Sequence, residues 1–226
     1  MRKVFVFIVL ICISYAEDFE DFIKGCESNN ASSCYELGVM YDNGNGTLQD
    51  FGQAISLYEK ACSLKFPSAC YNLGISHQSA QGVKQDIKKA MTFYEKACEY
   101  NLALGCYSLG VLYEDKEGFF GKRYYKEAVR FYDKACNLGE GLSCNNLALL
   151  YDNGKGVTQN SLKAMELYNK ACEKESASAC YNLGVSYYKG LGVEVNTVSA
   201  KEFFGKACEL KKQKGCDAYA ELNRQI

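Results

Sequence analysis

The chain has 226 residues, of which 48% are hydrophobic and 23% charged, with 26 Lys or Arg against 27 Asp or Glu. This balance provides no basic face of the kind that binds nucleic acid, so we expect no nucleic-acid partner. Thirteen cysteines are unusual for a protein of the reducing cytosol and indicate an exported chain.

The first 16 residues have the parts of a secretory signal peptide. Arg2 and Lys3 precede an apolar run over 4–13, and a small-x-small sequence ends at Ala16. The run is too short to span a membrane, which takes about 20 residues. Lipid attachment at Cys12 is the alternative, but the preceding residue is bulky where such sites take a small one. We predict cleavage after Ala16, which leaves 210 residues without a membrane span.

The other twelve cysteines form six pairs whose members are eight residues apart. Successive pairs are separated by 36 or 38 residues, and a fixed period of this size is typical of a solenoid. An even number of cysteines in an exported chain favours a full set of disulfides. The pairs are Cys26 and Cys34, Cys62 and Cys70, Cys98 and Cys106, Cys136 and Cys144, Cys172 and Cys180, and Cys208 and Cys216.

Each unit carries two segments whose apolar residues recur with helical spacing, which we name helix A and helix B. Helix A contains a Leu-Gly or Leu-Ala pair, and helix B contains an Ala, an aromatic residue and a closing Lys-Ala-Cys, as at 60–62. A Gly-rich break lies between the two helices. The third unit departs from this pattern, with two extra residues around 118–121 and Tyr124 at the cap position. The N-caps expected for helix B are Asp50, Asp86, Asn160 and Asn196.

The spacing of the cysteines tests this helical model. Residues eight apart in one continuous helix lie about 12 Å apart, whereas a disulfide needs Cα atoms within about 7 Å. If Cys62 pairs with Cys70, the chain must reverse over 63–69, and Pro67 opens the next helix. Each disulfide then joins helix B of one unit to helix A of the next. Zinc and thiol-redox sites are disfavoured, because C-x-x-C is absent and His77 is the only histidine, so we expect no metal or cofactor.

The L-G-x-x-Y, G-x-G, A-x-x-x-Y and K-A-C spacings resemble Sel1-like repeats, relatives of the tetratricopeptide repeat. With a cysteine pair in every unit, the sequence resembles the Helicobacter cysteine-rich protein (Hcp) family over the whole mature chain. The resemblance implies an all-α fold, a right-handed α/α solenoid with one disulfide per repeat, and a secreted or periplasmic location. It also implies the family's label of penicillin-binding protein or weak β-lactamase. We divide the chain into a signal peptide (1–16), an N-terminal capping half-repeat (17–30), five repeats (31–66, 67–102, 103–140, 141–176 and 177–212) and a C-terminal capping helix (213–226).

The sequence gives the enzymatic label little support. A serine β-lactamase, which hydrolyses penicillin and cephalosporin derivatives, needs a nucleophile with a nearby lysine together with S-D-N and K-T-G elements. One S-x-x-K occurs, from Ser186 to Lys189, and the other two elements are absent. Ser186 occupies a helix A position that is Met40 and Ser76 in other units, which indicates packing. We therefore expect a binding scaffold rather than an efficient enzyme, with Ser186 and Lys189 as weak catalytic candidates.

A binding role has a better physical basis. The positions one and two past the cysteine of helix A are not needed for the apolar stripe, and in tetratricopeptide relatives they face a concave groove. Asn there offers donors and acceptors to a peptide backbone or an amide-bearing glycan, and Tyr adds flat contact area. The alternative is that these residues only solvate the groove or pack between units. We expect a monomer that binds a peptide, a protein, a peptidoglycan fragment or a β-lactam. The candidate ligand-binding residues are Tyr35, Glu36, Tyr71, Asn72, Tyr107, Asn145, Asn146, Tyr181 and Asn182.

Overall fold

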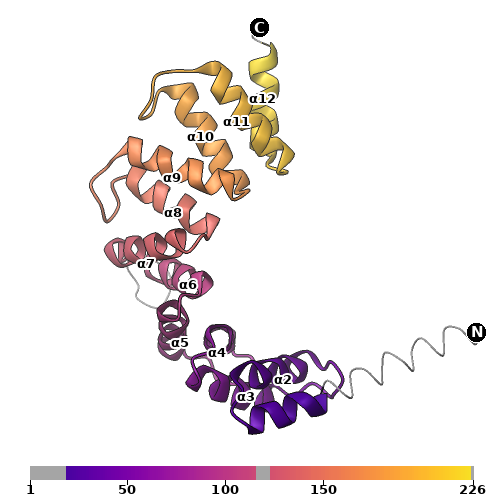
Figure 1. The fold of residues 1–226 in the computed structure, drawn as a ribbon. Helices are drawn as coiled ribbons and strands as arrows, with labels where there is room; N and C mark the ends of the chain where they lie inside the picture. The colour runs from indigo at the N-terminus through magenta and orange to yellow at the C-terminus, as the bar shows by residue number, and fades with distance from the viewer. Residues whose placement is uncertain (1–18, 116–122, 225–226) are drawn as a thin grey trace, which may run out of the picture. The chain divides into compact units, whose positions relative to one another are not determined.

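A computed structural model describes residues 19–115 and 123–224, which form helices joined by turns, with no strand among them (Figure 1). This confirms the predicted all-α fold. The predicted signal peptide and the loop at 118–121 lie outside the described residues. Residues 19–27 are helical. The helices that follow are α2 (Ala31–Asn43), α3 (Phe51–Ser63), α4 (Pro67–Ser79), α5 (Ile87–Glu99), α6 (Ala103–Glu114), α7 (Tyr125–Asn137), α8 (Gly141–Asp152), α9 (Ser161–Glu173), α10 (Ala177–Lys189), α11 (Thr197–Glu209) and α12 (Gln213–Arg224).

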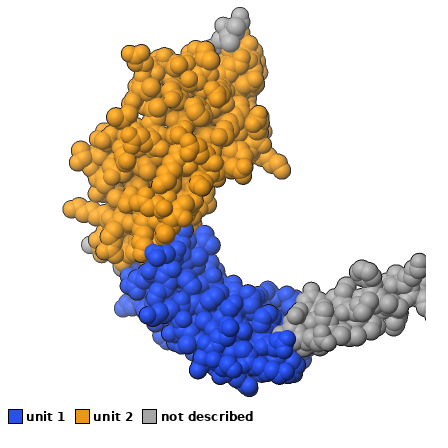
Figure 2. Space-filling model, viewed as in Figure 1, with its two compact units in different colours: residues 1–105 blue, residues 106–226 orange. Residues whose placement is uncertain are grey.

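The chain forms two compact units, residues 1–105 and residues 106–226 (Figure 2). In the first unit α3 packs against both α2 and α4, and α4 packs against α5. In the second unit each helix from α7 to α12 packs against the next one along the chain. Because even-numbered helices correspond to helix A and odd-numbered ones to helix B, each predicted pair is present and its contacts are local.

The predicted N-caps are confirmed. Asp50, Asp86, Asn160 and Asn196 each accept a hydrogen bond from the backbone N–H three residues on, at 2.9 to 3.0 Å. These side chains satisfy N–H groups that have no partner within the first turn of a helix. Tyr124, at the same position before α7, makes no such bond. The irregular third unit therefore begins its helix B without a side-chain cap.

The chain reverses between the two cysteines of each pair, as predicted. In the turn between α3 and α4, Lys65 adopts the left-handed conformation with φ of 64°, and Pro67 is the first residue of α4. Five disulfides have Cα–Cα distances between 4.5 and 4.8 Å and join cysteines eight residues apart. Cys98 and Cys106 are also disulfide-bonded. Within each unit the disulfides therefore tie a helix B to the helix A that follows it.

The core of each pair is an aromatic ring of helix B packed against the Leu-Gly of helix A. Tyr58, Tyr94, Tyr132 and Tyr168 are at most 2% exposed. A Cβ atom on Gly74 would lie 2.4 Å from a ring carbon of Tyr94, and one on Gly110 would lie 2.5 Å from Tyr132. The absent side chain lets the ring lie directly on the helix A backbone, which explains why a small residue recurs beside the Leu.

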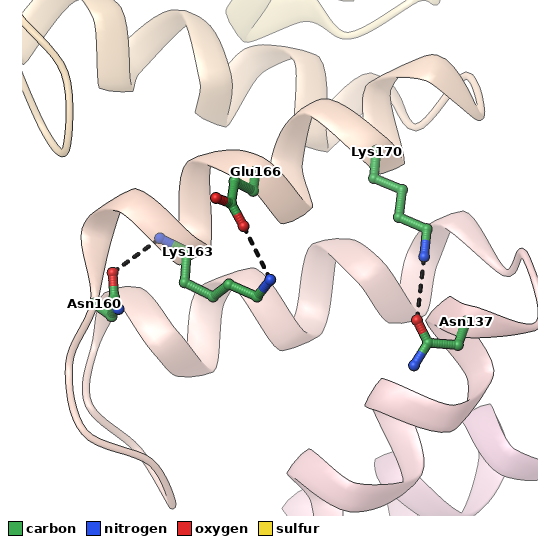
Figure 3. A network of polar contacts seen from close by, with 5 residues as sticks. All are labelled: Asn137, Asn160, Lys163, Glu166 and Lys170. Atoms are coloured by element: carbon green, nitrogen blue, oxygen red, sulfur yellow. Dashed lines mark hydrogen bonds and ion pairs between the residues drawn. The ribbon is translucent and has the colours of Figure 1, made fainter.

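In two repeats the lysine of the Lys-Ala-Cys sequence bonds to the helix that precedes its own repeat. Lys60 donates to the carbonyl oxygen of Cys26 at 2.5 Å, and Lys170 of α9 donates to Oδ1 of Asn137, the last residue of α7, at 3.3 Å (Figure 3). A cation at the carboxyl end of a helix also interacts favourably with the helix dipole. The same view shows an exposed ion pair on α9, in which Nζ of Lys163 lies 2.9 Å from Oε2 of Glu166.

Candidate functional site

The tyrosines predicted to line a groove each pack one ring face or edge against helix B. The positions just after the cysteine of helix A are half-buried, and their rings contact the central aromatic residue of the same repeat. These tyrosines are thus partly structural, and only part of each ring remains available for a ligand. The ring-centroid distances are 5.9 Å for Tyr35 and Tyr58, 5.6 Å for Tyr71 and Tyr94, 6.1 Å for Tyr107 and Tyr132, and 5.5 Å for Tyr181 and Phe204.

The fourth repeat has Asn145 where the other repeats have this tyrosine. Asn145, one of the predicted ligand-binding residues, is only 6% exposed, so little of its side chain lies at the surface. Its Oδ1 accepts a hydrogen bond from Nδ2 of Asn182 at 3.2 Å, and its Nδ2 donates to Oδ1 of Asn146 at 3.4 Å. A buried amide needs such partners, because an unpaired one costs about 1–3 kcal/mol. We call Asn145, Asn146 and Asn182 the amide cluster, and it joins α8 to α10.

Asn146 and Asn182 differ from Asn145 because both are half-buried. Asn182 donates one hydrogen bond to Asn145, and within the described residues its Oδ1 accepts none. Asn146 also interacts with the hydroxyl of Tyr132. The amide cluster therefore has a buried anchor, Asn145, and two members that can also contact a ligand.

Polar side chains from two successive repeats surround the hydroxyls of Tyr58 and Tyr35. Tyr58 donates to Oδ2 of Asp42 at 3.1 Å, and Asn72 of the next repeat interacts with the hydroxyls of Tyr58 and Tyr35. Glu36 lies near Tyr35, and its negative charge adds to the effect of burial in raising the pKa of that hydroxyl. Asn72 therefore links two repeats, as Asn146 does through Tyr132.

The acceptors for these hydroxyls were not predicted from the sequence. Tyr94 donates to Oε1 of Gln78 at 2.6 Å, and Tyr132 donates to Oε2 of Glu114 at 3.0 Å. The sequence does hold a signal, because every acceptor lies eight residues after the cysteine of its helix A. The four tyrosine–acceptor pairs are Tyr58 and Asp42, Tyr94 and Gln78, Tyr132 and Glu114, and Tyr168 and Asp152.

Burial raises the pKa of all four core tyrosines well above the usual value of a phenol. The negative charge of a nearby carboxylate adds to the effect for Tyr58, Tyr132 and Tyr168. These hydroxyls therefore stay protonated and act as hydrogen-bond donors, so they are unsuited to act as general bases near neutral pH.

The two weak catalytic candidates, Ser186 and Lys189, differ in exposure and in their contacts. Ser186 is 3% exposed, and its hydroxyl donates to the carbonyl oxygen of Asn182 in its own helix at 3.1 Å. Ser76 makes the same bond to Asn72 in the second repeat, at 3.0 Å. Lys189 is exposed at the end of α10. Ser186 therefore has the environment of a packing residue, as its register in the repeat predicted.

The single histidine lies in the core, as predicted. His77 is 7% exposed and stacks on Phe93, with ring centroids 5.5 Å apart and an interplanar angle of 9°. Tyr113 stacks on Phe131 in the same way in the third repeat. Nδ1 of His77 finds no hydrogen-bond partner among the residues that the structure describes. Across the described part of the chain, no three His, Cys, Asp or Glu residues come together in an arrangement that could hold a metal ion.

A pocket of about 400 Å³ opens in the second unit, between the fifth repeat and the capping helix α12. Asn182 and Tyr181, two of the predicted ligand-binding residues, form part of its wall. Phe204 of α11 and Leu222 of α12 are buried residues that also line it. The pocket therefore adjoins the amide cluster, because Asn182 of α10 belongs to both.

Comparison with solved structures supports the same fold. A protective antigen of uropathogenic Escherichia coli with a Sel1-like repeat fold is 29% identical with a TM-score of 0.84, and the alignment covers 90% of this chain and 43% of that one. The chain thus spans less than half of that protein. A Sel1 repeat protein from Oxalobacter formigenes is 24% identical with a TM-score of 0.74, covering 89% and 86% of the two chains. Cysteine-rich protein B of Helicobacter pylori is 36% identical with a TM-score of 0.48, covering 61% and 98%.

No curated protein matches the chain closely enough to transfer a function. The family model of the Sel1 repeat matches residues 31–66, 67–99, 103–140, 141–176 and 177–212. These matches cover most of the sequence and coincide with the helix pairs from α2 to α11. The chain therefore belongs to the Sel1 repeat family.

Proposed function

We propose that this protein is an exported, monomeric scaffold that binds extended peptide segments of a protein partner along its A helices. Sel1 repeat proteins mediate protein interactions, which supports a binding role. The observation that carries the specific proposal is the amide cluster on α8 and α10. Its buried member Asn145 fixes the position of Asn182, whose Oδ1 and remaining N–H can meet the N–H and C=O of a peptide backbone.

Side chains that are already held in place by other residues before a ligand arrives favour binding. An amide held by a hydrogen bond loses less conformational freedom when a ligand arrives than a free surface side chain does. The tyrosines beside the cluster are held in the same way by their contacts with helix B, and they present a rigid aromatic surface with a polar tip. An amide-bearing peptidoglycan fragment shares this hydrogen-bonding chemistry and is a second source of ligand for the same residues.

The proposed location rests on several features. The disulfides in the repeats fit a periplasmic or secreted protein, because they persist in oxidising compartments. Among the residues that the structure describes, no helix is both long enough and apolar enough to cross a bilayer. We propose that the segment 1–16 is a signal peptide that directs export and is then removed.

Selection from a displayed random-peptide library on the oxidised chain tests the proposal. The selected peptide is then added to ¹⁵N-labelled protein, and the side-chain NH₂ resonances of the asparagines are followed. We expect Asn146 and Asn182 to shift, while Asn169, which bonds Glu173 on the exposed side of α9, stays unchanged and serves as the control. A peptide that shifts only residues on the B helices would contradict the proposal.

The hydrolytic alternative makes a separate prediction. If Ser186 is only a packing residue, Ser186→Ala and Ser76→Ala should behave alike, because both hydroxyls bond the carbonyl oxygen four residues earlier. With nitrocefin as the probe we expect no turnover by the parent chain or by either variant. Turnover that disappears only in Ser186→Ala would establish a β-lactamase with this serine as its nucleophile.

A further inference from the structure

The fifth repeat departs from the others at three positions that lie together in the fold. In the first repeat these positions hold Tyr58, its acceptor Asp42, and Asn72 from the next helix A. The third repeat repeats this arrangement with a tyrosine, a glutamate and an asparagine. The fifth repeat has none of the three polar groups in register. The corresponding residues are Phe204, Tyr188 and, in the capping helix α12, Ala218.

These three residues all line the pocket of about 400 Å³ between the fifth repeat and α12. Phe204 is buried and carries no hydroxyl, so the floor of the pocket offers no hydrogen bond where the other repeats bury a tyrosine hydroxyl. Val185 and Leu222 complete an apolar wall. The sequence departures and the cavity therefore coincide. They replace a polar junction between repeats with a pocket whose buried lining residues, Phe204 and Leu222, are apolar, while the hydroxyl-bearing Tyr188 is exposed.

The rim of the pocket carries one positive and one negative side chain. Lys189 belongs to α10 and Glu221 to α12, and both are exposed. Because the two charges are opposite, these side chains add no net charge to the entrance of the pocket. Asn182 also lines the pocket, and it is the member of the amide cluster whose Oδ1 remains available for a peptide backbone.

We infer that this pocket receives an uncharged apolar side chain, aliphatic or aromatic, from the peptide whose backbone contacts Asn182. The inference rests on the proposed peptide-binding function and adds the residue type that the site selects. Burial of one such side chain strengthens binding on the order of ten- to a hundredfold over a Ser at the same position. The rim charges then lie beside the flanking residues of the peptide and outside the pocket.

The test uses the full oxidised mature chain and defined small probes, namely the blocked amides of single amino acids. N-acetyl-phenylalaninamide and N-acetyl-leucinamide are compared with N-acetyl-lysinamide, while the ¹³C methyl resonances of Val185 and Leu222 are recorded. We expect saturable shifts of these methyl groups with the two apolar probes and not with the lysine probe. Equal shifts with all three probes, or none, would overturn the inference.

A variant with the groups of the first repeat provides the matched comparison. Phe204→Tyr, Tyr188→Asp and Ala218→Asn together place the usual hydroxyl, carboxylate and amide in the pocket, and should abolish the probe-induced shifts. Tyr168→Phe in the fourth repeat removes a hydroxyl outside the pocket and should leave the shifts unchanged. If the triple variant does not fold, Ala218→Asn alone changes a half-buried position and should still weaken the shifts. Shifts that persist at full size in a folded triple variant, or in a folded Ala218→Asn variant, would overturn the inference.

The experiments distinguish a wrong assignment of the pocket from a wrong assignment of peptide binding to the amide cluster. A library-selected peptide that depends on Asn182 but tolerates exchange of every apolar residue for Ser would overturn the pocket assignment and leave peptide binding in place. Methyl shifts with the apolar probes, combined with a selected peptide that is indifferent to Asn182, would support the apolar pocket and contradict the peptide-binding role of the amide cluster.

Discussion

Nδ2 of Asn182 on α10 donates a hydrogen bond to Oδ1 of Asn145 on α8, across a distance of 3.2 Å. The two residues belong to consecutive repeats and differ in exposure, because Asn145 is buried and Asn182 is half-buried. One side chain thus belongs to the core and the other to the surface that we propose for ligand binding. Substitutions at the two positions should therefore have different effects on stability and on binding.

Asn145→Ala should destabilise the chain more than Asn146→Ala. Removal of the buried amide leaves Asn182 and Asn146 without their partner and creates a small cavity, which should lower the free energy of unfolding by about 1–3 kcal/mol. In Asn146→Ala, Asn145 keeps its hydrogen bond from Asn182 and Tyr132 keeps the one to Glu114, and water can reach the half-buried position. Urea denaturation of the oxidised variants measures the difference. Equal losses for the two variants would contradict the assignment of Asn145 to the core.

Ala80→Gly should stabilise the second repeat. Ala80 follows α4 in the left-handed conformation with φ of 60°, where the first and fifth repeats have Gly44 and Gly190 with φ of 70° and 72°. A residue with a Cβ atom costs about 1–2 kcal/mol in this region. We expect a gain of about 1 kcal/mol by thermal unfolding. As a control, Ala220→Gly within α12 should lower stability, and a loss at both positions would contradict the explanation.

The core tyrosines should make folding sensitive to alkaline pH. Their folded-state pKa is raised above that of the unfolded chain, so their contribution to stability is complete below pH about 10 and is lost as the pH rises. Each such group should reduce the free energy of unfolding by up to about 1.4 kcal/mol per pH unit in that range.

Absorbance at 295 nm and circular dichroism, recorded together, check this prediction. We expect the absorbance change to include a late component, from the buried tyrosines, that develops only as the helical signal falls. Tyr132→Phe should remove part of this late component, because Tyr132 is one of the buried tyrosines. A single ionisation step with the helical signal intact would show that the core tyrosines are accessible to solvent.

Loss of one disulfide should loosen the chain locally. Cys136 and Cys144 join α7 to α8, and the helices of the second unit pack mainly against their immediate neighbours. The closed loop is short, so its removal should cost roughly 2–3 kcal/mol in the chain-entropy model. Hydrogen exchange of the variant with both cysteines changed to Ser should increase in α7 and α8 before α11 and α12. A uniform increase along the unit would contradict local stability.

Much of the fold is predictable from the sequence because its repeat is strict. Helical spacing, the cap residues and the eight-residue spacing of the cysteines each predict a feature that the structure contains. The turn at Pro67 and the burial of His77 follow from the same register. Local rules of this kind suffice where neighbouring residues along the chain decide the structure.

The candidate site is less predictable, because it depends on contacts between repeats. The sequence placed Asn145 among the ligand-binding residues, but it does not show how α10 approaches α8 and covers that side chain. It likewise gave no indication that Tyr71 and its equivalents rest on a helix B aromatic ring. The apolar pocket arises from three departures on three helices, among them Phe204 and Ala218, which are recognised as related only once they are seen to share a cavity.

The central claim, that the amide cluster binds peptide backbone, is tested most directly by calorimetric titration of a library-selected peptide. The parent chain is compared with Asn182→Ala, with the Asn146→Ala/Asn182→Ala double variant and with Asn169→Ala as the control on α9. Each lost amide bond should cost about 0.5–1.5 kcal/mol, which is roughly a two- to twelvefold loss of affinity. We predict such a loss for Asn182→Ala, a larger one for the double variant, and none for the control, with the helical content unchanged. Unchanged affinity in a folded double variant would contradict the claim.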